Sequence, residues 1–469
     1  MSLDFLRVGS AYLREEGKRL DASYYSLAVR SRWELEQSGL PLKPLGELAS
    51  FGYIGRFKRH YVSRGPNAIP FVGSREVFFW PLKPKKFLHP DSVWDELFSS
   101  PGDILTSCSG SIGYSLLSGS SLKNVAISQH VIRIKAKKDI KEGYLYAFLR
   151  SRYGFSFMRG AQYGAVIKEI DPIVLSHMPV PILPKRVWGR IHAKMLRALS
   201  LRERGSCLLK KAERLLYEIL DLPDPSTIKP KYLPNPSGTK VRVFTVKLSA
   251  LEGRLDGSYH LPEVEGLLQA LITGKYPLAF LKEMTSYIQI PPRFKRHYVD
   301  EENGVPFVRP SDLATVRILE RRYIAKWTPE LPELRLNRDD VLISTDGSIG
   351  DTGYVTGNWD GWAGSNNIGR IRAQPNIAHP GYLYVFLASP YGQTQIQREI
   401  YGGVIDHLEE EHLQKLKIPQ APFEEQEKIG ILTLKAFELR DKANCIEEEA
   451  IRELEQILEK GVTPLSQQV

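Results

Sequence analysis

The sequence has few of the residues on which disulfide-rich or zinc-binding folds depend. Its 469 residues include only three cysteines, Cys108, Cys207 and Cys445, which lie far apart. They form no CxxC pair and no cysteine–histidine cluster, so neither a disulfide framework nor a zinc site is expected. Free thiols suit a reducing cytoplasm. We expect no metal and no cofactor.

Long apolar runs are also missing. No run approaches the roughly 18 residues that mark a membrane-spanning helix, and the opening segment, MSLDFLRVGS, lacks the charged and apolar regions of a signal peptide. The sequence therefore predicts a protein that stays in the cytoplasm and has no membrane partner.

Catalytic motifs are absent as well. The sequence contains no GxxxxGK[ST] phosphate loop, no HExxH, no GxSxG and no Asn/Asp-Pro-Pro-aromatic motif of amino-methyltransferases. The carboxylate runs at residues 409–411 and 447–449 are interpreted as solvated helix faces. A chain without catalytic activity is favoured, although the scattered carboxylates of a nuclease would be hard to see in one sequence. An autonomous nuclease hidden in divergent inserts therefore stays an alternative.

Charge and length are more informative. Lys and Arg outnumber Asp and Glu by 64 to 54, which gives a net charge of +10. This excess favours a polyanionic partner such as nucleic acid, although many basic proteins bind none. The length suggests two to four domains.

The sequence contains a long internal repeat. Seven blocks of the first half return in the same order in the second half, displaced by 235 to 238 residues. The pairs are residues 19–24 and 254–259, 56–62 and 293–299, 70–72 and 306–308, 103–105 and 340–342, 110–113 and 347–350, 143–149 and 381–387, and 163–167 and 401–405. The displacement is far longer than a solenoid repeat, so it indicates a duplicated domain.

Each half has the same order of predicted elements. Short β-like runs alternate with turns, and residues 143–149 and 381–387 suit short helices. An extended segment with several prolines, which we call the exit of the domain, follows in each half at residues 178–184 and 418–422. Between the shared blocks the halves diverge, and residues 78–86 have no obvious counterpart. A shared framework with divergent inserts is what two readers of different targets would need.

A long helical pattern follows each exit. The first stripe comprises Ile191, Met195, Leu199, Leu208, Ala212, Leu215 and Ile219, with a strained position at Gly205. The second comprises Ile429, Leu432, Ala436, Leu439, Ala443, Ile446, Ala450, Leu454 and Ile457. Each pattern predicts a helix of roughly 50 Å, and the nearest partner for each stripe is the other helix.

We therefore expect an α+β fold with two homologous globular domains joined by two long helices, packed as an antiparallel coiled-coil spacer. The expected boundaries are residues 1–185 for the first domain, 186–222 for the central helix, 223–250 for a linker, 251–424 for the second domain, 425–460 for the C-terminal helix and 461–469 for a flexible tail.

This order resembles the specificity (S) subunit of type I restriction–modification systems, or of a closely related methylation-based phage-defence system. The resemblance depends on residues 347–350 (GSIG) after 340–343 (DVLI), on the exit 417–426 (KIPQAPFEEQ), and on the helix beginning near Lys428. It covers nearly the whole chain. The first exit, residues 180–188, departs from the pattern because it lacks the Glu-Gln pair, which puts in doubt the details of its contact with a partner.

The resemblance implies a non-catalytic, sequence-specific subunit that binds double-stranded DNA. Each target-recognition domain would read one half of a bipartite site, and the helices would set the gap. Two copies of a separate methyltransferase subunit would dock on the helices, and a motor-nuclease subunit could join for cleavage. A protein-binding scaffold is the other reading of the same architecture.

The repeated basic block supplies the first DNA-binding candidates. In an extended chain, Arg56, Lys58 and His60 share one face, which suits a track of phosphates. The alternative is a polar strand surface with aromatic anchors. The candidates in this block are Arg56, Lys58, Arg59 and His60 and their copies Arg293, Lys295, Arg296 and His297.

A shared block cannot explain different targets, so base reading is expected from the divergent inserts, unless these charges are merely solvated. The candidates are Arg75, Lys83, Lys85 and Lys86 in the first half and Arg309, Arg317, Arg321 and Arg322 in the second. Gln129 and His130 align with Asn366 and Asn367, so different amide-bearing residues at one position could read different bases. A turn or a buried hydrogen bond is an equal alternative for them.

Two loops complete the predicted interface. The GSIG loops permit close approach of the backbone to a phosphate, although a tight strand-to-strand turn is the favoured interpretation. Tyr163 and Tyr401, with Lys168 near the first, are expected either on the DNA face or in the core.

Overall fold

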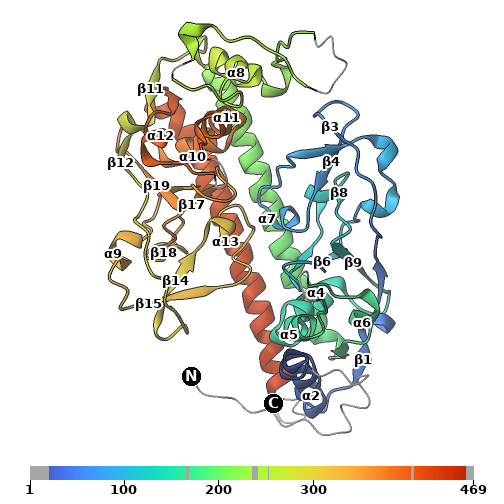
Figure 1. Cartoon of the computed structure of the whole chain (residues 1–469). Helices are drawn as coiled ribbons and strands as arrows, with labels where there is room; N and C mark the ends of the chain where they lie inside the picture. Colours follow the sequence, from blue (N-terminus) through green and yellow to red (C-terminus); the bar gives the residue numbers. More distant parts are fainter. Residues whose placement is uncertain (1–20, 165–167, 235–240, 252, 403–405, 461–469) are drawn as a thin grey trace. The chain divides into compact units, whose positions relative to one another are not determined.

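The computed structural model describes residues 21–164, 168–234, 241–251, 253–402 and 406–460 (Figure 1). The predicted blocks at residues 19–20, 165–167 and 403–405, part of the linker and the tail lie outside this range. The chain forms two compact units, residues 1–203 with 442–469, and residues 204–441. Each unit holds one globular lobe and one part of each long helix. We call residues 21–184 the first lobe and residues 253–422 the second lobe.

Within its described residues the first lobe has three small sheets. One has the order β2-β9-β6-β7 and is antiparallel. Another has the order β3-β5-β4-β8, in which only β4 and β8 are parallel. The third is the pair β1-β10. The strands are β1 (Leu42–Pro44), β2 (Ala49–Gly52), β3 (Tyr61–Val62), β4 (Ile69–Val72), β5 (Lys86–Leu88), β6 (Ile104–Ser107), β7 (Ser115–Leu117), β8 (Ala126–Ile127), β9 (Val131–Ala136) and β10 (Pro179–Pro181).

The second lobe repeats this topology strand for strand. Its described sheets have the orders β12-β19-β16-β17, β13-β15-β14-β18 and β11-β20, and β14 and β18 are again the parallel pair. The strands are β11 (Leu278–Phe280), β12 (Thr285–Gln289), β13 (Tyr298–Val299), β14 (Gly304–Val308), β15 (Arg322–Ala325), β16 (Val341–Ser344), β17 (Thr352–Tyr354), β18 (Ala363–Gly364), β19 (Ile368–Ala373) and β20 (Lys417–Pro419). The predicted duplication is therefore confirmed at the level of topology.

Most helices match as well, although α3 and α9 correspond to the short 3₁₀ turns η8 (Leu281–Glu283) and η4 (Asp95–Leu97) of the other lobe. The first lobe has η1 (Tyr24–Val29) with α2 (Arg30–Gln37), α3 (Leu45–Leu48), α4 (Glu142–Arg150), α5 (Arg152–Gly160) and α6 (Pro172–Ser176). The second has α8 (Pro262–Ile272), α9 (Leu331–Leu334), α10 (Pro380–Ala388), α11 (Pro390–Glu399) and α12 (Glu410–Gln414). The short helices and extended exits predicted from the sequence are present as α4, α10, β10 and β20. The insert at residues 78–86, which has no counterpart in sequence, leads into β5, the structural equivalent of β15.

One shared block explains how each lobe attaches to its long helix. The hydroxyl of Tyr144 on α4 donates to the carbonyl of Pro181 at 2.6 Å, and that of Tyr382 on α10 donates to Pro419 at 2.6 Å. A side chain at Gly143 would collide with His192 of α7, and one at Gly381 would collide with Gly430 of α13. Glycine is therefore required where α4 and α10 meet the long helices.

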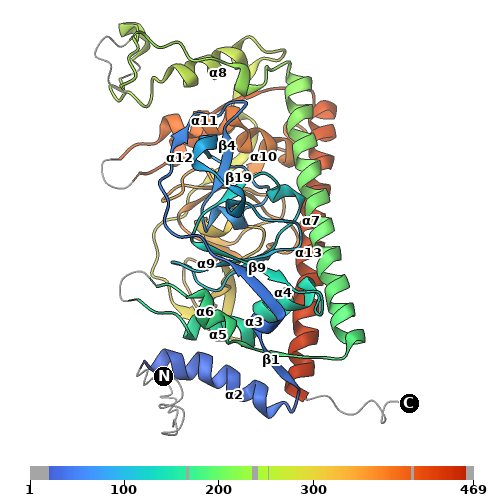
Figure 2. The same cartoon turned by 90° about the vertical axis from the view of Figure 1, so that its right-hand side faces the viewer.

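The long helices are α7 (Lys185–Leu220) and α13 (Phe423–Lys460). In the first unit they run antiparallel, because Arg190 and Lys194 bind Glu453 at 2.6 and 2.8 Å while Arg202 binds Asn444 at 2.7 Å. The carboxyl of Glu453 loses solvation there, but these two cations hold its pKa below the ordinary value. Figures 1 and 2 show the remaining parts of the two helices side by side within the second unit. The predicted α+β class with paired long helices is confirmed.

In both helices one stripe of buried positions alternates three- and four-residue steps, and further buried residues such as Leu201 and Phe437 lie beside it. In α7 the stripe positions are Ile191, Met195, Ala198, Arg202, Gly205, Leu209, Ala212 and Leu216. In α13 they are Gln426, Ile429, Thr433, Ala436, Arg440, Ala443, Glu447, Ala450 and Leu454. This average step of 3.5 residues is the heptad pattern of a left-handed coiled coil. Three successive heptad positions of each helix are small, at residues 198, 205 and 212 and at residues 436, 443 and 450, which permits the helix axes to approach closely there.

The heptad pattern corrects the predicted stripe of α7. Leu208, Leu215 and Ile219 are only partly buried, whereas Leu209, Leu216 and Leu220 are buried. The predicted stripe omits Arg202 and Gly205, which occupy stripe positions, because neither is a typical apolar core residue. After them, the predicted Leu208, Leu215 and Ile219 each lie one residue before the buried position. Gly205 is a small position of the seam rather than a strained one.

The interpretation of residues 447–449 as a solvated face is wrong for Glu447. Its side chain is fully buried in the first unit. Arg150 of α4 and Arg202 of α7 form ion pairs with its carboxylate, and the hydroxyl of Tyr146 donates to it at 2.5 Å. One carboxylate therefore joins the first lobe, α7 and α13.

Replacing Glu447 by Ala should lower the free energy of unfolding by about 3–5 kcal/mol, because two guanidinium groups would stay buried without their counterion. Urea unfolding of the purified chain, followed by circular dichroism, measures this loss. The matched control is Glu449→Gln on the exposed side of the same turn, which should change stability by less than about 0.5 kcal/mol. Equal unfolding midpoints for the two variants would show that the buried cluster contributes nothing.

Candidate nucleic-acid interface

The repeated basic block lies in the segment that leads into β3 in the first lobe and into β13 in the second. In the first lobe Arg56, Lys58 and His60 are exposed, while Phe57 and Arg59 are partly buried. In the second lobe Arg293, Lys295 and Arg296 are exposed and His297 is partly buried. The carbonyls of His60 and His297 accept equivalent backbone hydrogen bonds, from His89 at 2.9 Å and Ala325 at 3.0 Å. Each block is therefore fixed against the strand that its own insert provides.

The second arginine of the block contacts the variable amide in the first lobe. Arg59 donates to the side-chain oxygen of Gln129 at 2.5 Å, and its guanidinium lies 5.4 Å from the ring centre of Phe57 and 5.2 Å from that of Phe71. The amide nitrogen of Gln129 lies 3.2 Å from Nε2 of His130. Arg59 is therefore a link between the shared block and the two candidate reading residues.

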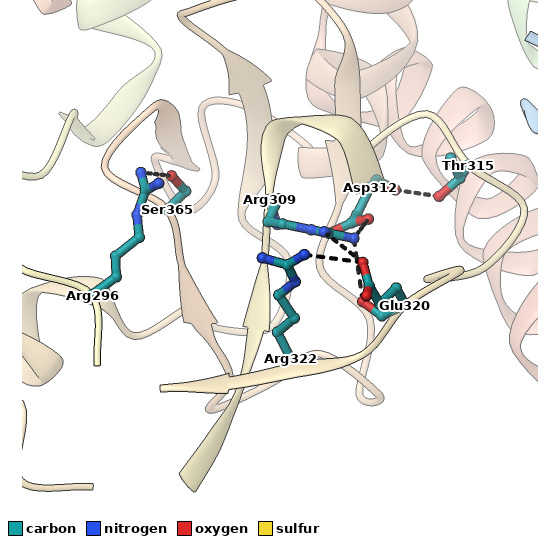
Figure 3. Close-up of polar contacts among 7 residues, drawn as sticks. All are labelled: Arg296, Arg309, Asp312, Thr315, Glu320, Arg322 and Ser365. Atoms are coloured by element: carbon teal, nitrogen blue, oxygen red, sulfur yellow. Dashed lines mark hydrogen bonds and ion pairs between the residues drawn. The ribbon is translucent and has the colours of Figure 1, made fainter. Parts of the chain in front are cut away.

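The second lobe has the same arrangement with different amides. Arg296 donates to Asn366 at 2.9 Å. It also donates to Ser365 at 3.3 Å (Figure 3). Its guanidinium lies 6.0 Å from the ring centres of both Phe294 and Phe307. Arg59 and Arg296 thus hold a variable amide in one orientation, which leaves the adjoining His130 and Asn367 only partly buried. We call each of these sets an arginine–amide cluster: Arg59, Gln129 and His130 in the first lobe, and Arg296, Asn366 and Asn367 in the second.

The turn that carries each amide is built identically. The backbone N–H of Ser128 donates to Val72 at 3.0 Å, and that of Ser365 donates to Val308 at 2.9 Å. Beneath the turn, Arg133 is buried and donates to the carbonyls of Leu97, Ile127, Phe98 and Val131. Burial lowers the pKa of Arg133 to about 10. The equivalent Arg370 is likewise buried, but it donates to the carbonyl of Arg335 and to the side-chain oxygen of Gln289 instead of to the turn.

The GSIG loops also meet these turns. They connect β6 to β7 and β16 to β17, and Gly110, Gly113, Gly347 and Gly350 all have φ values between 74° and 90°. The residue at the start of each loop bonds to the amide turn, since the N–H of Cys108 donates to His130 and that of Thr345 donates to Asn367, both at 3.0 Å. The favoured interpretation as a tight turn agrees with these contacts, and each loop adjoins an arginine–amide cluster.

The two loop tyrosines are at the surface. Tyr163 is 48% exposed and Tyr401 is 36% exposed, so neither is packed in the core. The hydroxyl of Tyr401 donates to Glu409, and this bond together with partial burial raises its pKa to about 12. Lys168 is exposed, and its carbonyl accepts from Gly110 at 3.1 Å. A role of these residues in binding DNA stays a prediction.

The insert candidates differ in their surroundings. Arg75, Lys83, Lys85 and Lys86 are exposed in the first lobe. In the second lobe Arg309 binds Asp312 at 3.0 Å and Glu320 at 3.5 Å, and Arg322 binds the same Glu320 at 3.1 Å (Figure 3). Arg321 is exposed and lies 5.4 Å from the ring centre of Trp362.

Arg317 stands apart from these insert residues. It is only 8% exposed, so a base contact from it would require it to leave the interior. The roles of all the insert residues stay predictions.

Sequence reasoning missed several exposed aromatic residues beside the repeated block. Tyr61 and Tyr298 occupy equivalent positions and are 48% and 45% exposed. Trp327 is 64% exposed, and its ring centre lies 4.7 Å from that of His297. The tyrosines belong to the block itself, so their repetition was an available signal, whereas nothing in the sequence links Trp327 to His297.

Within the described ranges no group of three or more His, Cys, Asp or Glu side chains could hold a metal ion. No described helix is long and apolar enough to cross a membrane.

Two lobes of one topology, each presenting a basic segment beside a variable amide turn, define a candidate DNA-recognition protein. Residues 280–456 match the family model described as "Type I restriction modification DNA specificity domain". This range includes nearly all of the second lobe and most of α13. The predicted family resemblance is confirmed there.

Similar solved structures span both halves. The S subunit of a type I restriction–modification system from M. genitalium covers 90% of this chain and 95% of its own, with 15% identity and a TM-score of 0.34. The HsdS subunit from Thermoanaerobacter tengcongensis covers 90% of this chain and 96% of its own, with 16% identity and a TM-score of 0.28. A search of curated proteins gave no match.

Replacing Arg59 by Met should remove its hydrogen bond to Gln129 while keeping most of its packing against Phe57 and Phe71. We expect specific DNA binding by the assembled complex to weaken by about 1–3 kcal/mol, the usual cost of losing one base contact, with little change in binding to unrelated DNA. Competition binding with specific and unrelated duplexes measures the ratio.

The control is Lys58→Met, which removes an exposed charge from the same segment and should weaken both kinds of binding together. If Arg59→Met also lowers both affinities equally, the arginine–amide cluster has no part in specificity.

Proposed function

We propose that this chain is the specificity subunit of a type I restriction–modification system or of a closely related methylation-based defence system. In this proposal residues 1–185 and 251–424 are two target-recognition domains, and each reads one half of a bipartite site in double-stranded DNA. The subunit performs no covalent chemistry, and it directs separate methyltransferase subunits to the site in the cytoplasm. A motor-nuclease subunit would join for cleavage.

The observation that carries the proposal is the repetition of one strand topology in both lobes, one of which matches a DNA specificity domain. Two copies of a reading domain in one chain provide two reading surfaces. Because the framework is common while the inserts and amides differ, the two surfaces would recognise different half-sites. The net charge of +10 supports binding to a polyanion.

The shared and variable residues suggest a division of roles. The exposed side chains of Arg56 and Lys58, like those of Arg293 and Lys295, would contact phosphates and position the lobe. Gln129 and Asn366 are buried in their clusters, so the adjoining His130 and Asn367 and the exposed insert residues would reach base edges, since amide groups pair with adenine and arginine pairs with guanine. This division explains why the basic block is repeated while its neighbours differ.

The proposal is tested by sequencing native DNA from cells that express this chain with its methyltransferase partner, and from cells that lack the chain. Methylation that depends on the chain should occur at one split motif with a fixed unread gap. An unsplit motif, or methylation that persists without the chain, would refute the proposal. Incubating the chain alone with Mg²⁺ and DNA should leave the DNA intact, whereas cleavage would favour the alternative of an autonomous nuclease.

The heptad seam gives a second prediction. Adding seven residues to both α7 and α13, after residues 203 and 441, preserves the alternation of three- and four-residue steps. Each helix would lengthen by about 10.5 Å, so the gap in the methylated motif should grow by roughly three base pairs at about 3.4 Å each. Both half-sites should stay the same. A motif with an unchanged gap would show that the helices do not set the spacing.

A further inference from the structure

The second unit has a basic hollow that takes no part in the interface described above. It encloses about 580 Å³ and lies among α8, α11, α12 and the strand pair β11-β20, elements that Figure 1 shows together at one end of this unit. Five of its lining residues carry a fixed positive charge and one carries a carboxylate. They are Arg254, Lys282, Arg398, Lys415 and Lys417, with Glu399.

A buried tyrosine holds two of the arginines in place. Tyr259 is 6% exposed, and the guanidinium groups of Arg398 and Arg254 lie 3.9 and 4.7 Å from its ring centre. Arg254 also binds Asp256 at 2.7 Å, and this bond lowers the pKa of the Asp256 carboxyl to about 2. Asp256 therefore compensates Arg254, while Lys282, Lys415 and Lys417 add further positive charge to the hollow beside Arg398 and Glu399.

The duplicated lobe serves as an internal comparison. The first-lobe residues equivalent to Lys282, Arg398, Lys415 and Lys417 carry no fixed positive charge; they are Gly46, Gly160, His177 and Pro179. The backbone is also tightly packed at Gly160, where an added side chain would collide with Ala28. The shared framework thus folds without these cations, and their presence in the second lobe needs another explanation.

Electrostatics identifies the kind of ligand. Like charges gathered in a concave surface repel one another, and the low-dielectric walls concentrate their field on any anion that enters. Lysine and arginine bind phosphate through charge-assisted hydrogen bonds, and the volume exceeds the needs of a single phosphate. We propose that this hollow binds a ligand with two or more phosphate groups, which come either from a free nucleotide or polyphosphate or from the backbone of DNA.

The proposed phosphate site would be separate from the residues that read the DNA sequence. The arginine–amide clusters occur in both lobes, whereas the cations of the hollow occur only in the second, so reading a half-site does not require them. The proposal therefore stands or fails independently of the proposed function.

Isothermal titration of the purified full chain with inorganic tripolyphosphate at low ionic strength tests the site directly. We expect saturable binding that weakens by about tenfold or more in the double variant Arg398→Gln, Lys417→Gln. Arg398→Lys should retain most of the affinity. The matched control is Lys210→Gln, Lys211→Gln, which removes two exposed charges from α7 of the same unit and should leave binding unchanged.

Competition then identifies the source of the phosphates. Displacement of tripolyphosphate by a short duplex of arbitrary sequence would assign the hollow to DNA backbone, and displacement by ATP alone would assign it to a free nucleotide. If the double variant does not fold, hydrogen exchange of the native chain replaces it, and tripolyphosphate should protect residues 390–399 and 410–417. Absence of binding by the native chain, equal binding by a folded double variant, or absence of that protection would overturn the proposal.

Discussion

The heptad seam of the two long helices is the constraint on which the rest of the structure depends. A helix of this length with one apolar stripe is not stable alone in water, so α7 and α13 must cover each other and the lobes. Small residues at three successive heptad positions of each helix permit close approach, and polar residues at other seam positions make that approach specific. In the first unit Glu447 provides this specificity, because a buried carboxylate tolerates only the register in which Arg150, Arg202 and Tyr146 all reach it.

Because this seam holds the long helices together, the sequences of the lobes can differ. Each lobe begins and ends in a two-stranded ribbon, in which Leu42 pairs with Pro181 and Leu278 pairs with Pro419. The ends of each lobe therefore lie side by side, and the sheets between them can change without disturbing the long helices. The arginine–amide cluster likewise combines a constant framework with one variable residue. One shared arginine and two shared phenylalanines hold an amide that differs between lobes, so only the reading group needs to change.

Most of the architecture could be predicted because it depends on patterns along the chain. The duplication, the short helices, the proline-rich exits, the GSIG turns and the two long helices are all visible in the sequence. The sequence predicted the buried seam positions only in part, because a stripe that includes Arg202 and Glu447 is not uniformly apolar. Burial of Glu447 depends on residues of α4 and α7 that lie far away in sequence, and no local pattern reveals such partners.

The candidate site could be predicted only in part for the same reason. Arg59 and Gln129 were both identified as candidates, but their contact spans 70 residues and became visible only in the fold. The sequence also could not separate Arg317, which is buried, from the exposed Arg321. The basic hollow was not predicted, because Lys282, Arg398 and Lys417 are scattered over three elements.

Exchanging the two lobes within the chain tests the central claim most directly. Residues 42–181 would replace residues 278–419 and the reverse, with both junctions in the matched ribbons and the helices unchanged. If each lobe is an independent reader held on a common pair of helices, native methylation should move to a motif with the same two half-sites in the opposite order and the same gap. A folded, active exchange variant that still methylates the original motif would contradict the account.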